Sequence, residues 1–178
     1  MKKVVALTVL SLSMLFTACG PTAEKLPAAP ADVASVSALV KGKKFVVTKA
    51  GLISPLSSPD NTLSIQWIDA TVAGDFEKQA EEELKKFSIQ FLNDTSVVVL
   101  NGDKQFEGTY SIDNIMDEYD SEEGIKIRLT YVDPEMSFGS EPMEATYTYP
   151  VKGAGDNKLL LQFPRSINRQ PVVGLLTE

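Results

Sequence analysis

The sequence predicts a mainly β domain, namely an eight-stranded antiparallel up-and-down barrel with one or two short helices. Aromatic and β-branched residues cluster in short runs, as they do on pleated, half-buried strands. Turn signals separate these runs at regular intervals, which is typical of a meander that closes into a barrel or a sandwich. The stretch from residue 32 to residue 178 is long enough for eight strands and a helix.

Two short helices are expected among the strands. Asp32 is a suitable N-cap for a helix through Val40, and Gly42 suits the C-terminal end of that helix. A second helix is predicted over Asp75–Lys86, with Asp75 as its cap and Glu81–Glu83 facing solvent. The apolar stripe of this second helix has the spacing i, i+4, i+8 and comprises Phe76, Ala80 and Leu84.

About eight strands are predicted from period-two alternation and from the turns between the runs. Asn101-Gly102 is the strongest hairpin signal, and a longer connection contains Pro134, Gly139 and Pro142. The segments with β character are Lys44–Ala50, Leu63–Ile68, Phe87–Leu92, Ser96–Leu100, Gln105–Asp113, Ile125–Asp133, Glu144–Val151, Lys158–Phe163 and Val172–Leu176.

The first eighteen residues have the features of an export signal, with a basic start, an apolar stretch to Phe16 and small residues before Cys19. The apolar stretch is shorter than the ~20 residues that span a bilayer. Residues 15–19, Leu-Phe-Thr-Ala-Cys, resemble the bacterial lipobox, although Phe16 stands where Leu is usual. The resemblance implies cleavage before Cys19 and a lipid thioether on that cysteine. The alternative is an ordinary secretory signal with a chance cysteine.

The chain therefore divides into a signal peptide (1–18), a lipidated cysteine with a Pro/Ala-rich tether (19–31) and the barrel domain (32–178). Prolines in the tether prevent a helix and favour an extended, solvated linker, which gives a reach of up to ~35 Å at ~3.1 Å per residue. Gly20 rather than Asp follows the cysteine, which by analogy with the sorting rule of enteric bacteria implies the outer membrane.

Composition excludes several classes of site. The chain has no histidine and a single cysteine, so a Ser-His-Asp set, an internal disulfide and a cysteine-based zinc site are excluded. The first eighteen residues hold two lysines and no acid, so the remainder carries 15 basic and 24 acidic residues, a net charge of −9. An acidic domain repels phosphate backbones, which argues against nucleic acid as a partner. No cofactor is predicted.

Three segments of the domain are similar to the lipocalin-like (calycin) domains of small Gram-negative lipoproteins. They are Leu39–Gly42 leading into the first strand, Phe91–Asp94 before a hairpin, and Phe106–Ile112, which resembles a G-x-Y-x-I strand. Lipocalins place Trp two residues after the first-strand glycine, but this chain has Lys44 there, followed by Phe45. The resemblance implies an up-and-down barrel and implies no particular ligand.

Aromatic side chains are the candidate ligand-lining residues, because they combine a large contact area with a polar handle. On alternating strands the competing interpretation is a packed core, with Tyr110 and Tyr131 pointing inward. Tyr149 belongs to the same group of tyrosines. The residues predicted to line a ligand cavity are Phe45, Trp67, Phe106, Tyr110, Tyr131 and Tyr147.

The acidic loop 113–124 invites a calcium interpretation, but Ile115 and Tyr119 occupy positions where an EF-hand needs oxygen ligands. A solvated loop is the preferred interpretation, and no metal site is predicted. Paired carboxylates such as Asp117 and Glu122 are the only basis for a hydrolase.

Arg165 and Arg169 flank the last loop, where lipocalins can use an arginine to cap the barrel. Here a surface salt bridge is the preferred interpretation.

The sequence thus predicts a membrane-anchored, non-enzymatic lipoprotein whose barrel binds a small apolar ligand. The alternative is a protein-interaction or inhibitor module of a cell-surface complex, and a hydrolase ranks third. A ligand binder should have a cavity lined by Tyr110 and Tyr131. An interaction module should have a filled barrel and an exposed apolar patch, for example on the excursion Gly51–Ile68.

Overall fold

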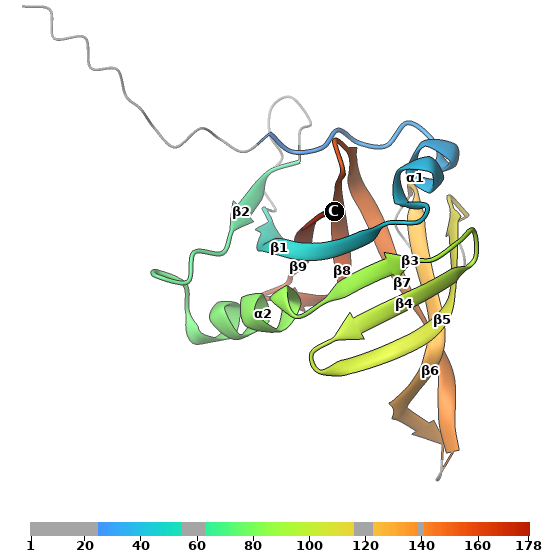
Figure 1. Cartoon of the computed structure of the whole chain (residues 1–178). Helices are drawn as coiled ribbons and strands as arrows, with labels where there is room; N and C mark the ends of the chain where they lie inside the picture. Colours follow the sequence, from blue (N-terminus) through green and yellow to red (C-terminus); the bar gives the residue numbers. More distant parts are fainter. Residues whose placement is uncertain (1–24, 55–62, 116–122, 139–140) are drawn as a thin grey trace, which may run out of the picture.

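Alternating apolar residues form one antiparallel sheet that closes on itself (Figure 1). The computed structural model describes residues 25–54, 63–115, 123–138 and 141–178, so the expected signal peptide and Cys19 lie outside the described residues. The described strands are β1 (Lys44–Ile53), β2 (Ile65–Trp67), β3 (Ser88–Phe91), β4 (Ser96–Asn101), β5 (Lys104–Asp113), β6 (Lys126–Phe138), β7 (Glu141–Gly155), β8 (Lys158–Ile167) and β9 (Gln170–Thr177). The helices are α1 (Val33–Val40) and α2 (Asp75–Lys85).

Within the described chain, eight strands make the barrel and β2 is an extra strand. Neighbours in sequence pair in the order β3 to β9, and β1 closes the ring by pairing with both β3 and β9. The first half of β1 pairs with β3, and its second half, from Gly51 to Ile53, pairs with β2 on the same edge. The predicted eight-stranded antiparallel barrel with two short helices is therefore confirmed.

Helix α1 closes one end of the barrel. Asp32 Oδ1 accepts a hydrogen bond from the Ser35 amide at 2.7 Å, which satisfies one of the unpaired N–H groups of the first turn. Gly42 follows the helix with φ of +73°, a conformation that glycine adopts without strain. Val36 and Val40 are fully buried against the barrel.

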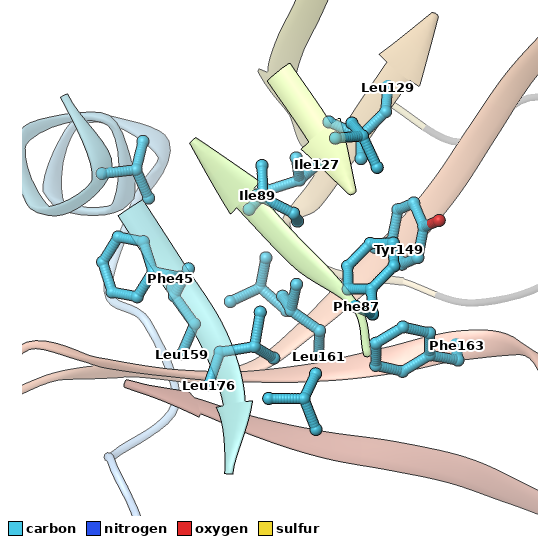
Figure 2. Close-up of a cluster of buried hydrophobic side chains, with 14 of the residues drawn as sticks. Phe45, Phe87, Ile89, Ile127, Leu129, Tyr149, Leu159, Leu161, Phe163 and Leu176 are labelled. Carbon is cyan, nitrogen blue, oxygen red and sulfur yellow. The ribbon is translucent and has the colours of Figure 1, made fainter. Parts of the chain in front are cut away.

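The inner face of the barrel is filled by side chains from β1, β3, β6, β8 and β9 (Figure 2). Phe45 is 0% exposed, and its ring meets that of Phe91 edge to face at 6.2 Å. The fully buried residues around them include Ile89, Ile127, Leu129, Leu159, Leu161 and Leu176. Because these side chains occupy the middle of the barrel, a ligand site has to lie toward an end.

The C-terminal part of the predicted tether packs on the barrel. The amide of Ala154 in β7 donates to the Ala28 carbonyl at 2.9 Å, and Pro27 is buried. A Cβ on Gly153 would lie 2.5 Å from the Pro27 carbonyl oxygen, so the close approach requires glycine. The expectation of a wholly solvated tether is thus wrong for these residues, because an extended segment without its own hydrogen bonds finds a partner on β7.

Helix α2 differs from its prediction in three details. Its N-cap is Gly74 rather than Asp75, and the Glu77 carboxylate accepts from the Gly74 amide at 2.6 Å. Ala80 and Leu84 are buried as expected, but Phe76 in the first turn is 81% exposed. Glu81, expected in solvent, is buried along its stem while its carboxylate reaches Lys85 at 2.7 Å. The stem covers apolar surface and the charge remains paired, so the buried face is rotated from the predicted stripe.

Strands β6 and β7 continue through the region predicted as a long connection. Beyond Asp133 the two strands stay paired, with Ser137 opposite Pro142 and a register shift between Asp133 and Ser137. Pro134 lies within that irregularity, one of the places where a sheet tolerates a residue without an amide donor. The resulting hairpin projects beyond the barrel, at the bottom of Figure 1.

In the described ranges, no helix has both the length and the apolar character that a membrane span requires.

Candidate functional site

The barrel wall divides at one end, where β7 and β8 separate. Their ladder runs from Gly155 opposite Lys158 to Val151 opposite Leu161. Beyond that point β7 continues along β6 while β8 continues along β9, so the two hairpins diverge (Figure 1). This end lies opposite the one that α1 closes, and α2 lies beside it.

A pocket of about 280 Å³ occupies this division and is called here the β7–β8 pocket. Its walls come from β6, β7 and β8, from the end of β4, from the C-terminal half of α2, and from Phe87 between α2 and β3. The lining residues are Glu83, Leu84, Phe87, Asn101, Tyr131, Asp133, Tyr147, Tyr149, Phe163, Pro164 and Arg165.

Three rings in contact with one another form the floor of the pocket, and Phe163 meets the other two edge to face. Phe87 meets Phe163 at 5.1 Å between centroids, Tyr149 meets Phe163 at 5.5 Å, and Phe87 meets Tyr149 at 5.7 Å. Figure 2 shows the three side chains gathered on one side of the core, away from Phe45. Gly174 makes this arrangement possible, because a Cβ there would lie 2.7 Å from Phe163 Cε2.

A row of stacked rings forms a second wall. Tyr131 lies between Phe106, at 4.8 Å, and Tyr147, at 5.0 Å, with interplanar angles of 24° and 20°. The three residues belong to neighbouring strands and share the inward face, so cross-strand pairing sets their spacing. Gly108 opposite Tyr131 allows β5 and β6 to approach closely here, because a Cβ would clash with the Thr130 carbonyl oxygen and lie 2.8 Å from Tyr131 Cβ.

The rim of the pocket is polar. The Tyr147 hydroxyl donates to Asp133 Oδ2 at 2.6 Å, and Arg165 Nη1 lies 2.9 Å from Glu83 Oε2. The hydrogen bond from Arg165 lowers the pKa of Glu83 below its usual value, with a smaller contribution from Gln79, so the carboxylate stays ionised at neutral pH. An apolar floor beneath a charged rim suits a ligand with one apolar and one polar end.

Burial raises the pKa of two tyrosines of the pocket. Desolvation raises the pKa of both Tyr131 and Tyr149 well above the usual value of 10.0, and the neighbouring tyrosines add to the shift. Both rings therefore present an uncharged phenol to the pocket across the physiological range.

The structure places the six predicted ligand-lining residues in different surroundings. Tyr131 and Tyr147 line the β7–β8 pocket, together with Tyr149 from the same group of tyrosines. Phe106 stacks on Tyr131 without being one of the lining residues. Two of the six predicted residues therefore lie on one wall of this candidate pocket, and their role in binding stays a prediction.

The other three predicted residues lie outside this pocket. Phe45 is in the packed core, and the Tyr110 hydroxyl donates to the Asn93 carbonyl at 2.7 Å, near the end that α1 closes. Trp67 lies on the outer side of the barrel, beside a separate cluster formed by Leu160, Val173 and Leu175. Trp67 belongs to the extra strand β2, so its alternation could not reveal which side of the barrel it faces.

Several lining residues were not predicted. Phe87 and Phe163 have the same inward alternation as their strand neighbours, and only the separation of β7 from β8 turns their position into a pocket floor. Asp133 was counted as the end of a strand. Its sequence signal is its two-residue spacing from Tyr131, which places both on the inward face.

The described part of the acidic loop is held by basic residues of β6. Arg128 Nε lies 3.2 Å from Asp113 Oδ2, and Arg128 Nη2 donates to the Ile115 carbonyl at 3.1 Å. Lys126 is 0% exposed, beneath the same segment. Asp117 and Glu122 lie outside the described residues. Within the described ranges, no group of three or more metal-ligating side chains comes together.

Of the two arginines near the last loop, Arg165 forms the predicted surface salt bridge, to Glu83. Arg169 lies in the β8–β9 turn with φ of +66°.

Comparison with protein-family models, with curated proteins and with solved structures finds no match to this chain.

Proposed function

We propose that this chain is a non-enzymatic lipoprotein, anchored in the outer membrane through Cys19, which binds a small amphipathic molecule in the β7–β8 pocket. The observation that carries the binding role is the pocket itself, with three packed aromatic rings as its floor and an acidic and basic rim above them. Small-molecule sites usually combine mostly apolar walls with a few placed polar groups.

The size of the pocket bounds the ligand. A volume of about 280 Å³ equals about nine waters at their liquid volume and lies just below the usual range of ligand pockets. Because the core around Phe45 is filled, the ligand occupies the end of the barrel and not its axis. The sequence predicted a small apolar ligand in a cavity lined by Tyr110 and Tyr131; the proposal here places the ligand at the barrel end, beside Tyr131 but away from Tyr110.

We propose in addition that the barrel is lipocalin-like. The support is the up-and-down order of the strands, closure by β1 with β9, and a helix ahead of β1 that covers one end. Lys44 stands where lipocalins have Trp, and the next residue, Phe45, lies in the core.

Retention of a ligand is the direct test of the binding role. Full-length protein released from its host membranes should carry a non-covalent small molecule in native mass spectrometry. Tyr147→Ala removes a wall and the hydroxyl that Asp133 accepts from, so this variant should lose the retained mass. Phe106→Ala truncates the same aromatic row outside the pocket and should keep it. Wild-type protein without any retained mass, or equal retention in Tyr147→Ala, contradicts the binding role.

The anchor has a separate test. Metabolic labelling with a palmitate analogue should mark the wild-type chain and leave Cys19→Ser unlabelled, because the thiol is the acceptor for the lipid. Each buried CH₂ contributes ~0.8 kcal/mol, so several acyl chains hold a protein on a membrane where one does not. Equal label in both chains, or none in either, would end the lipoprotein proposal and leave the pocket proposal intact.

A second candidate function is a protein-interaction module, favoured by the projecting β6–β7 hairpin. Val132, Met136 and Met143 of this hairpin are all about half exposed, and methionines suit adaptable binding surfaces. Replacing Met136 and Met143 by glutamine should abolish a crosslinked partner at the cell envelope if this function holds. The ligand retained by the pocket should be unaffected by the same change.

A further inference from the structure

Part of β7 has a neighbouring strand on one side only. Its pairing with β6 extends over most of its length, from Pro150 to Glu141. On the opposite side, β8 is the strand that pairs with β7 in the described chain, and it does so only from Val151 to Gly155. The segment 144–148 therefore has β6 on one side and the space that contains the β7–β8 pocket on the other (Figure 1). It is called here the open β7 edge.

Backbone groups of alternate residues point out from this edge. The Val151 amide donates to the Ile125 carbonyl at 2.8 Å, so residue 151 directs its backbone hydrogen-bonding groups toward β6. The register between β6 and β7 is unbroken over residues 143–150 of β7, and antiparallel strands alternate these groups between their two edges. The residues whose N–H and C=O groups point away from β6 are therefore Glu144, Thr146 and Thr148.

Two prolines explain why the ladder between β7 and β8 ends where it does. Pro150 has the same alternation as Thr148, so it is the next residue of β7 that faces β8, and it has no N–H to donate. Pro164 of β8 lines the pocket and lacks an N–H as well. The ladder loses donors from both strands at this point, and the open β7 edge lies just beyond it.

An edge of this kind is a template for an extended peptide. In such strand addition, main-chain hydrogen bonds supply affinity, and pockets for alternate side chains supply specificity. A residue of an added strand that lies opposite Tyr147 would point to the inner face, as Tyr147 does, because residues directly opposite each other share a face. The pocket there has about 280 Å³ and aromatic walls from Tyr147, Tyr149 and Phe163, so it suits an apolar side chain.

Charge favours a basic peptide over a second copy of this chain. Glu141 and Glu144 are exposed on the outer face of β7, and the chain from Cys19 has 15 basic and 24 acidic residues. Lysines on the outer face of an added strand would complement these carboxylates. Two open β7 edges in contact would instead bring two acidic domains together, which their like charges oppose.

We propose that the open β7 edge binds an extended peptide of a partner protein as an added antiparallel strand. One apolar side chain of the peptide enters the β7–β8 pocket, and basic side chains lie on the outer face. The antiparallel direction follows the fold, since every described pair of strands is antiparallel. This inference rests on the proposed ligand-binding function and names the class of its ligand.

A dye-labelled peptide of sequence Lys-Val-Thr-Leu-Thr-Val-Lys, blocked at both ends, tests the added strand. Its binding to the full-length protein in a non-ionic detergent is measured by fluorescence anisotropy. With the leucine opposite Tyr147, the threonine amides face β7 and the valine amides face away. N-methylation of both threonine amides should weaken binding at least about tenfold, whereas N-methylation of both valine amides should change it less than about threefold. Glutamate in place of both lysines should weaken binding about tenfold.

Two variants of one residue locate the strand on β7. Thr146→Pro removes an N–H of the open β7 edge and should weaken peptide binding about tenfold. Thr146→Val keeps that N–H and removes only the hydroxyl, which lies 2.9 Å from the Thr130 hydroxyl, so it should leave the affinity unchanged. Urea unfolding shows whether each variant is folded, and the N-methylated peptides decide the matter on the wild-type chain if Thr146→Pro is not.

The outcomes separate this inference from the proposed function. Equal effects of the two N-methylations, or equal affinities of Thr146→Pro and Thr146→Val when both are folded, overturn the added strand. A dimer in light scattering that the peptide does not dissociate also overturns it, because a second copy then covers the edge. So does failure of the peptide to bind. A retained non-peptide mass in native mass spectrometry would overturn the peptide and support the proposed function, which that measurement decides independently.

Discussion

Replacing Phe163 by alanine, compared with the same change at Phe45, tests whether the β7–β8 pocket reaches into the core as described. Both changes remove a phenyl ring from the barrel interior. Phe45 is 0% exposed in a closed core, whereas Phe163 is 6% exposed and borders the pocket. Phenylalanine to alanine in a core costs about 3–5 kcal/mol, and the value depends on whether the site can collapse or fill.

We expect Phe45→Ala to reach the upper part of that range, at about 4–5 kcal/mol, because nothing can enter the space it leaves. Phe163→Ala should cost about 3 kcal/mol, because its space merges with the pocket and admits water. The loss at Phe163 includes two edge-to-face contacts, with Phe87 and Tyr149, of about 0.5–1.5 kcal/mol each. Only Phe163→Ala should change the affinity of the ligand.

Urea unfolding followed by circular dichroism measures both free energies on the full-length chain in detergent. A small domain has about 5–15 kcal/mol in total, so either change is a large fraction of it, and the m-value should stay constant. If Phe163→Ala destabilises the protein as much as Phe45→Ala or more, the ring is sealed from the pocket. That result would show that Phe163 is not part of the pocket floor.

Two further predictions concern the tether and the buried phenols. Gly153→Ala should displace Pro27, because the Pro27 carbonyl oxygen would lie 2.5 Å from the new Cβ. The Ala154 amide, which donates to the Ala28 carbonyl, should then exchange its hydrogen faster. An unchanged exchange rate would contradict the packing of the tether on β7. Stability should fall as pH rises above about 10, because the unfolded chain then releases phenol protons that Tyr131 and Tyr149 keep in the fold. The fall is up to about 1.4 kcal/mol per pH unit for each tyrosine, and Tyr149→Phe should remove half of their joint contribution in urea unfolding between about pH 9 and about pH 11.

The pattern of the sequence was sufficient to predict the barrel and helix α1. Period-two alternation, the Asn101-Gly102 hairpin signal and the Asp32 cap are local signals. Asp32 bonds to Ser35 as expected, and the chain forms the predicted hairpin, but its loop is one residue later: Asn101 pairs with Lys104, and the loop residues are Gly102, with φ of +65°, and Asp103. Alternation also placed Tyr131 and Tyr147 on one inward face, since adjacent antiparallel strands keep their faces in register.

The pocket could not be predicted, because it depends on where two strands stop pairing. Tyr149 and Phe163 have the alternation of core residues, and nothing local tells that the ladder ends at Val151 opposite Leu161. The position of Trp67 could not be predicted from alternation either. A short strand can alternate perfectly and still lie outside the closed ring, as β2 does through its pairing with the second half of β1.

The packing of the tether fixes where the chain enters the barrel relative to the pocket. Pro27 lies on Gly153, near the turn between β7 and β8 and at the end that α1 closes, whereas the pocket lies where the same strands have diverged (Figure 1). If Cys19 carries the lipid, the anchor precedes Pro27 by eight residues in the sequence, and Pro27 is held at the barrel end opposite the pocket. The site of attachment and the candidate ligand site are then at different ends of the barrel, so a change at Gly153 that releases Pro27 should alter the tether without altering the pocket.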